Sequence, residues 1–349
     1  METKIVRMAE EQIDMELIRE AGKIIRDGGL VAFPTETVYG LGGDALNPLS
    51  SRKIYAAKGR PSDNPLIVHI ADLQALSPIV GEIPGNARKL AERFWPGPLT
   101  MILHKSDRVP YETTGGLDTV AVRMPANRIA QEMIRAAGGY VAAPSANRSG
   151  RPSPTVARYV AEDLAGRVEM IIDGGDVEIG LESTIVDLTS DRPMVLRPGY
   201  ITLQDLESVL SRVEEDRTLM EEDAGQAPKA PGMKYRHYAP KGEMTVIKGV
   251  EEQVMSYINE RCREYRDAGR KTGVIATDET LSGYCADVCR SVGCRHDEEA
   301  IARELYRILR EFDDEAVEVI YAEAFDDSGI GRAIMNRLLK AAGHRVHLV

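Results

Sequence analysis

The residues best suited to ligand binding or catalysis follow apolar runs of the sequence. They include hydroxyl-bearing residues, cations and glycines. In AFPTETVYGLGGD (32–44), Thr35, Glu36, Thr37 and Tyr39 directly follow an apolar run and precede three glycines. A strand that ends this way presents hydrogen-bonding groups and bare backbone, which suits the binding of a polar ligand against a sheet. A loop that only turns the chain would account for the stretch equally well.

A second stretch, YAAKGRPSDNPLIVHI (55–70), brings cations close to flexible backbone. Lys58 and Arg60 fall in a loop rich in glycine and proline, and Asn64 precedes a strand that carries His69. An arginine fork and a lysine point charge both suit phosphate oxygens. A solvated basic loop and a histidine satisfied within the core are the alternatives.

In the stretch DTVAVRMP (118–125), successive side chains are expected to point to opposite faces of a strand. Thr119, Ala121 and Arg123 share one face of it. An arginine in so apolar a strand needs an anionic ligand or a carboxylate partner. A structural ion pair would satisfy it as well as a ligand would.

In YVAAPSANRSGRPSPT (140–155) another strand runs into polar residues. Ser145, Asn147 and Ser153 could donate to a nucleotide, and two arginines add charge. The motif G-x-S-x-G is absent, which disfavours a serine nucleophile. A surface turn is the competing interpretation.

The runs LESTIVDLT (181–189) and VLRPG (195–199) predict a hairpin that brings Ser183 and Arg197 to one rim. The chain has no G-x-x-x-x-G-K-[ST], so a nucleotide would be bound without a P-loop. A single G-x-G at Gly329 and Gly331 is weak support for a dinucleotide site.

The elements that position these motifs alternate between short β-rich runs and helical periodicity. We expect a mixed, twisted sheet with helices packed on it, because strands outnumber helices. The predicted strands are 30–33, 66–70, 99–104, 119–124, 139–143, 169–173, 183–188 and 194–197, and the predicted helices are 15–28, 49–58, 85–94, 126–137 and 155–165.

The composition changes at 212–230, which is acidic, poor in large apolar groups and closed by prolines, as a linker is. The following PGMKYRHYAPKG (231–242) is too rich in aromatic and basic groups for a simple spacer. From 244 the pattern predicts a small, mostly parallel α/β domain. Its strands are expected at 244–248, 273–276 and 317–323, and its helices at 251–268, 297–311 and 329–342.

The length and composition of the chain limit the classes of protein to which it can belong. A chain of 349 residues favours two domains, and a net charge of −11 disfavours bulk binding of nucleic acid. The four cysteines lack C-x-x-C pairing and are expected to be free, mostly buried thiols. No apolar run is long enough for a membrane helix and no signal region is present, which predicts a cytoplasmic protein.

Taken together and in this order, FPTETVYGLG, KGRPSDNPLIVHI, SANRSGRPSPT and LESTIVDLT…VLRPG closely resemble the YrdC-like family of threonylcarbamoyl-AMP synthases. The segment 231–242 and the α/β module after it resemble the longer, two-domain form. The resemblance implies a YrdC-like catalytic domain at 1–211, a linker and lid at 212–242, and a small Rossmann-like domain at 243–349.

The resemblance implies a nucleotidyltransferase that makes threonylcarbamoyl-AMP and pyrophosphate from L-threonine, bicarbonate or CO2, and ATP. This is the first step toward the threonylcarbamoyladenosine next to the anticodon of tRNA, and a separate transferase completes it. Such chemistry depends on positioning and charge neutralisation, so no catalytic nucleophile is expected.

By similarity, the threonine site would contain Thr37, His69, Arg123 and Ser183, with Arg123 holding the carboxylate. The nucleotide and its phosphates would be surrounded by Lys58, Arg60, Asn64, Thr119, Ser145, Ser153 and Arg197. Thr35 and Asn147 adjoin both groups and rank lower. Arg123→Ala is expected to lose activity by roughly 2–4 kcal/mol while keeping the fold.

Mg²⁺ is expected with ATP, although no carboxylate cluster indicates its ligands. Tyr235 and His237 are expected to close over the pocket as a lid that excludes water.

Two other functions remain open. Arg148 and Arg151 would allow binding of double-stranded RNA, although the net charge disfavours it. A carbamoyl-transfer module of hydrogenase-maturation type is the other, but those proteins carry zinc-binding cysteine pairs that this chain lacks.

Overall fold

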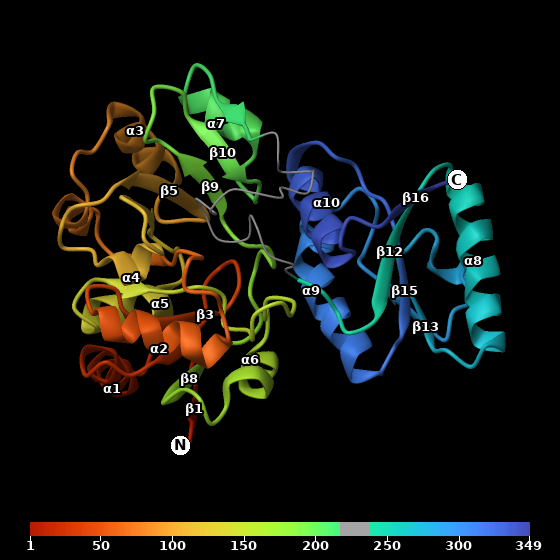
Figure 1. Cartoon of the computed structure of the whole chain (residues 1–349), viewed down its shortest axis with the longest axis horizontal. Coiled ribbons are helices and arrows are strands. Elements are labelled where there is room, and N and C mark those ends of the chain that lie inside the picture. The colour runs from red at the N-terminus through yellow and green to blue at the C-terminus, as the bar shows by residue number, and fades with distance from the viewer. Residues whose placement is uncertain (217–237) are drawn as a thin grey trace. The chain divides into compact units, whose positions relative to one another are not determined.

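A computed structural model describes residues 1–216 and 238–349 (Figure 1). Tyr235 and His237 lie outside these residues. The described chain packs as two compact units, one of residues 1–149 and 153–216 and one of residues 238–349 with 150–152. No helix in these ranges is long and apolar enough to cross a bilayer.

The first unit is built on an 11-stranded mixed sheet with the order β1-β8-β2-β3-β7-β4-β6-β5-β9-β10-β11. The prediction of a mixed sheet is confirmed, since parallel pairs such as β4 with β6 alternate with antiparallel pairs such as β5 with β6. The strands are β1 (Lys4–Arg7), β2 (Val31–Phe33), β3 (Gly40–Asp44), β4 (Ile67–His69), β5 (Leu99–His104), β6 (Thr119–Arg123), β7 (Val141–Ala142), β8 (Met170–Asp173), β9 (Thr184–Asp187), β10 (Met194–Arg197) and β11 (Glu214–Glu215).

Helices cover this sheet, and the first of them shows how sequence sets their limits. Helix α1 starts at Asp14, whose carboxylate accepts hydrogen bonds from two backbone N–H groups of the first turn. It packs on α5 closely enough that a Cβ at Gly22 would stand 2.5 Å from the backbone of Ala136. The helices of this unit are α1 (Met15–Arg26), α2 (Pro48–Lys58), α3 (Gly85–Phe94), α4 (Tyr111–Thr114), α5 (Arg128–Ala136), α6 (Ala157–Leu164) and α7 (Leu203–Val209), with 3-10 turns η1 (Leu73–Ala75) and η2 (Ser77–Ile79).

The glycine-rich stretch GLGGD is strand β3, at a place where the sequence pattern predicts no strand. A Cβ at Gly42 would lie 2.8 Å from a methyl of Val141 and 2.9 Å from the ring of Phe33. This glycine therefore allows the close packing of neighbouring strands. The predicted linker 212–230 also contains structure at its start, because β11 pairs with β10.

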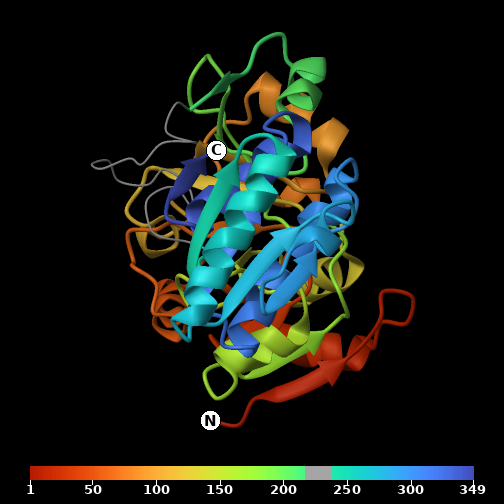
Figure 2. The ribbon, with the colours of Figure 1, turned by 90° about the vertical axis from the view of Figure 1, so that its right-hand side faces the viewer.

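The second unit contains a fully parallel sheet with the order β14-β13-β15-β12-β16, as the alternation of its sequence predicts. Figure 2 shows α8 packed over one face of this sheet and running roughly along its strands. The elements are β12 (Glu243–Lys248), α8 (Glu251–Asp267), β13 (Thr272–Ala276), η4 (Leu281–Gly283), β14 (Val288–Ser291), α9 (Glu298–Asp314), β15 (Val319–Glu323), α10 (Gly329–Ala341) and β16 (Val346–Leu348).

All four cysteines belong to the second unit and are free. Cys262 is buried in the contact between α8 and the sheet, but Cys285 and Cys289 are half-buried and Cys294 is exposed. The expectation of mostly buried thiols is therefore wrong, because three of them lie on strand edges and loops.

Candidate active site

The loop between β2 and β3 is held by the hydroxyl groups that its sequence supplies. Thr35 Oγ1 donates to the carbonyl of Val38 at 2.7 Å and accepts from the backbone N–H of Thr37 at 3.2 Å. The two threonine hydroxyls share a hydrogen bond of 2.9 Å, and Thr37 is fully buried. The sequence places Thr37 at the site by way of a local turn that Thr35 stabilises.

Glu36, between the two threonines, forms a buried ion pair with Arg123. Arg123 Nη2 lies 2.7 Å from Glu36 Oε1, and both side chains are only 5% exposed. The carboxylate partner that Arg123 requires is thus a residue of the first motif. Arg123 Nε and Glu36 Oε2 are also buried but have no hydrogen-bond partner among the described residues. Unsatisfied buried groups are uncommon in native structures, and binding of a ligand is one explanation for them.

His69 lies beside this pair. It is in register with Arg123 across the parallel strands β4 and β6, and its Nδ1 is 3.1 Å from the carbonyl of Ile67. Burial, and to a lesser degree the charge of Arg123, lowers the pKa of His69 to about 3. The imidazole is therefore neutral near pH 7, where it can exchange hydrogen bonds without adding charge.

Ser183 joins the same group through β5. Thr100, in register with Arg123, shares a 2.7 Å hydrogen bond with the hydroxyl of Ser183. Arg197 donates to the Ser183 hydroxyl at 3.1 Å and to its carbonyl at 3.0 Å. The predicted hairpin is confirmed, since β9 and β10 pair antiparallel and bring Ser183 and Arg197 into contact.

A second group surrounds the ammonium of Lys58, at the end of α2. The ammonium donates to the carbonyls of Ser145 and Asn147, and at 3.3 Å to the amide oxygen of Asn147. The hydroxyl of Ser145 donates to the same amide oxygen at 2.5 Å. Lys58 is 2% exposed, so the structure holds a buried cation among carbonyl oxygens.

Arg60, Asn64 and Ser153, which were also predicted, make fewer hydrogen bonds. Arg60 donates to the carbonyls of Asn64 at 3.2 Å and Pro65 at 3.1 Å, and Asn64 Oδ1 is buried with no partner in the described ranges. Ser153 donates to Glu182 at 2.6 Å, next to Ser183 in the chain.

Thr119 stands apart from the Arg123 group. It opens β6, which Arg123 closes, so the two residues lie about 13 Å apart at roughly 3.3 Å per residue of strand. The structure therefore brings Thr37, His69, Arg123, Ser183 and Arg197 together and leaves Thr119 at the opposite end of the strand.

Three contact residues were not selected from the sequence. Each of them binds a predicted site residue: Glu36 binds Arg123, Thr100 binds Ser183, and Glu182 binds Ser153. Thr100 and Glu182 were missed because they meet their partners across the sheet and through a loop. The alternation of β5 was the signal that could have indicated Thr100.

Comparisons with known proteins define the family. The family described as Telomere recombination matches residues 23–199, and the family described as Threonylcarbamoyl-AMP synthase, C-terminal domain, matches residues 201–343. The chain belongs to the threonylcarbamoyl-AMP synthase family. It is an enzyme of this kind.

Relatives of full length support this assignment. The threonylcarbamoyl-AMP synthase of Pyrococcus abyssi is 48% identical over 342 residues, which cover 98% of both chains. That of Bacillus subtilis is 49% identical over 330 residues, covering 94% of both. The crystal structure of P. abyssi Sua5 complexed with L-threonine matches with a TM-score of 0.93 and 47% identity, over 99% of both chains.

Proposed function

We propose that this enzyme makes threonylcarbamoyl-AMP and pyrophosphate from L-threonine, bicarbonate or CO2, and ATP. The observation that carries the proposal is the buried Glu36–Arg123 pair with its unsatisfied atoms, in a fold shared with a structure of P. abyssi Sua5 that contains L-threonine. A buried guanidinium with a spare donor is suited to a carboxylate.

For threonine we propose a site made by Thr37, His69, Arg123 and Ser183. Arg123 Nε would donate to the substrate carboxylate, while Glu36 keeps the guanidinium fixed in position. Neutral His69 and the hydroxyls of Thr37 and Ser183 would hydrogen-bond the polar groups of the substrate without adding charge. Thr35 would contribute indirectly, because its hydroxyl stabilises the turn that holds Thr37.

For the nucleotide we propose contacts with Lys58, Arg60, Asn64, Thr119, Ser145, Ser153 and Arg197, with Asn147 beside Lys58. Arg197 touches Ser183, so the same hairpin would link the threonine and nucleotide sites. The distance between Arg123 and Thr119 along β6 is compatible with an extended nucleotide, which would span the strand.

The reaction requires no protein nucleophile. The amine of threonine and CO2 form a carbamate, whose oxygen attacks the α-phosphorus of ATP while the bond to pyrophosphate breaks. Positioning of the carbamate in line with that bond, and neutralisation of phosphate charge by Lys58, Arg60 and Arg197, are the tasks that we assign to the protein.

Mg²⁺ would enter with ATP. The described residues contain no group of three or more His, Cys, Asp or Glu side chains that could hold a metal ion by themselves. We therefore assign most of the ligands of the ion to phosphate oxygens and water, as is usual for Mg²⁺ bound with nucleotides. The ion would supply positive charge that offsets the negative charge of the phosphates.

We further propose that the product serves the modification of tRNA next to the anticodon, through a separate transferase. The product is a mixed anhydride that transfers its acyl group readily, so it requires an acceptor enzyme downstream.

Release of pyrophosphate from ATP tests the proposed function. With bicarbonate and Mg²⁺ present, addition of L-threonine should stimulate release, while L-serine, which lacks one methyl group, should be less effective by about 10-fold or more. Release that does not respond to threonine would overturn the proposal.

A further inference from the structure

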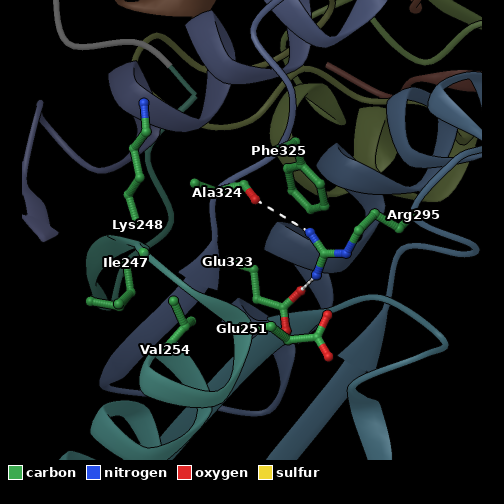
Figure 3. A pocket seen from close by; sticks show the side chains of 9 residues that line it. Ile247, Lys248, Glu251, Val254, Arg295, Glu323, Ala324 and Phe325 are labelled. Atoms are coloured by element: carbon green, nitrogen blue, oxygen red, sulfur yellow. Dashed lines mark hydrogen bonds and ion pairs between the residues drawn. The ribbon is translucent and has the colours of Figure 1, made fainter. Parts of the chain in front are cut away.

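The second unit contains a pocket of about 290 Å³ where β12 and β15 end (Figure 3). Its walls come from the end of β12, the first turn of α8, the end of β15 and the loop before α9. The residues that line it are Ile247, Lys248, Gly249, Glu251, Val254, Arg295, Glu323, Ala324 and Phe325. All of them belong to the second unit.

The strand order explains why a pocket forms at this place. From β12 the chain crosses through α8 to β13, whereas from the adjacent β15 it crosses through α10 to β16, in the opposite direction along the sheet. The two connections therefore run over opposite faces of the sheet. Helix α8 lies on one face, and α9 and α10 lie on the other (Figure 1). Open parallel sheets bind ligands outside the carboxyl ends of the strands at such a switch point.

One wall of the pocket is a fixed polar network. Glu323 is 3% exposed, pairs with Arg295 Nη2, and accepts a 2.6 Å hydrogen bond from the hydroxyl of Tyr284. Burial and the nearby carboxylate raise the pKa of Tyr284, so the hydroxyl remains a donor. Arg295 Nε is buried and has no hydrogen-bond partner among the described residues, which leaves one donor of this network unused.

A second carboxylate adds negative charge. Glu251, the first residue of α8, lies beside Glu323 in Figure 3, and both act electrostatically on Tyr284. The carboxylates of Glu251 and Glu323 balance the cations of Arg295 and Lys248, so the lining carries separated charges of both signs and no net charge, which suits a zwitterion better than a phosphate. Lys248 and the backbone N–H groups of α8, whose N-cap Val250 provides no side-chain cap, supply positive potential at the other side.

The rest of the wall is apolar. Ile247 and Val254 lie across the pocket from Phe325, as Figure 3 shows. A ligand of this pocket therefore needs an ammonium group, an anionic group and a short apolar portion in a volume at the lower end of the range for small-molecule sites.

We propose that this pocket binds a free α-amino acid with an aliphatic side chain, at a site separate from the catalytic residues. The ammonium group of the ligand lies between Glu251 and Glu323. Its carboxylate accepts from the Arg295 guanidinium and the first turn of α8, and its side chain packs on Val254 and Phe325. This site goes beyond the proposed function and does not depend on it.

Methyl-labelled NMR of the full chain tests the proposal, because Ile247 and Val254 line the pocket and carry methyl groups. L-Leucine, L-isoleucine and L-valine at millimolar concentration are the probes, with AMP and inorganic phosphate as anionic alternatives. At least one of the three amino acids should shift both methyl signals in a saturable way, and the two anions should not.

Two variants and a matched control sharpen the test. Glu251→Gln should weaken binding about 10-fold by removing a charged hydrogen-bond partner, and Arg295→Lys should weaken it through loss of the guanidinium fork. Glu252→Gln, at the next residue of α8, which is also exposed, should leave it unchanged. The proposal is overturned if none of the three amino acids shifts the signals, if AMP or phosphate shifts them instead, or if Glu251→Gln and Glu252→Gln bind alike.

Discussion

At the scale of single residues, Arg123 reaches the site as one half of a buried ion pair. Its Nη2 binds Glu36, whereas its Nε has no hydrogen-bond partner among the described residues. Removal of one partner of a buried pair leaves the other charge without compensation, at a cost of about 3–5 kcal/mol. The expectation that Arg123→Ala keeps the fold unchanged must therefore be revised.

Arg123→Ala should lower both stability and activity. We expect the free energy of unfolding to fall by about 3–5 kcal/mol and the threonine-dependent kcat/KM by roughly 30-fold to 1000-fold. The double variant Glu36→Gln/Arg123→Ala should recover much of the stability, since no buried charge remains, but not the activity. Urea denaturation and steady-state kinetics measure the two effects.

An exposed arginine provides the control for this pair. Arg52 forms an ion pair with Glu112 on the surface, with 66% and 32% exposed side chains, so Arg52→Ala should change stability by less than about 1 kcal/mol. Recovery of threonine affinity in the double variant would contradict the role of Arg123.

His69 makes stability depend on pH in a defined direction. Its folded pKa of about 3 lies below its usual value, so the unfolded chain binds the proton more readily. Its contribution to stability is complete above about pH 6.5 and is lost as the pH falls toward 3.

The variant His69→Gln should therefore lose stability less steeply than the parent chain between pH 6.5 and pH 4, by about 1 kcal/mol or more. Denaturation midpoints at several pH values measure this. Parallel pH profiles for the two proteins would show that His69 is not held neutral by the fold.

At the scale of elements, the hairpin of β9 and β10 depends on a close approach at Gly199. A Cβ there would lie 2.5 Å from the backbone nitrogen of Thr184 and 2.8 Å from the carbonyl oxygen of Glu182. These atoms are backbone, so they cannot move aside as a side chain would. The contact between Arg197 and Ser183 is built across this approach.

Gly199→Ala should therefore reduce stability by about 1–3 kcal/mol and kcat/KM for ATP by about 10-fold or more, because the shifted hairpin separates Arg197 from Ser183. Gly85→Ala is the control, since a Cβ at Gly85 has no atom within 4 Å. Equal kcat/KM for ATP in the two variants would show that the hairpin does not contribute to the proposed site.

The strands with strong β-type runs were predictable from the sequence, whereas those without such runs were not. β5, β6 and β10 fall where apolar alternation places them, but β3 was missed because its glycines conceal a strand packed against Phe33 and Val141. β1, β14 and β16 were missed because they are short and lie at sheet edges.

The site was predictable where a motif is local and unpredictable where it depends on packing. Ser183 and Arg197 meet through a hairpin that the pattern indicates. The partner of Arg123 is 87 residues away, and the strand order β2-β3-β7-β4-β6 brings Glu36 to it. Sequence alone left open whether that partner was a ligand or a carboxylate.

At the scale of the whole molecule, the net charge of −11 bears on the RNA-binding alternative. Binding to a phosphate backbone depends on cations and is weakened by salt. We therefore expect no saturable binding of a double-stranded RNA at physiological salt in a filter-binding assay. Tight binding with a steep decrease as salt rises would support the alternative.

In the proposed reaction, threonine forms a carbamate before the adenylate is made. Mass spectrometry of the product made from ATP, L-threonine and ¹³C-labelled bicarbonate tests this step. We expect threonylcarbamoyl-AMP that is heavier by its single labelled carbon. An unlabelled threonyl-adenylate, or no adenylate despite pyrophosphate release, would contradict it.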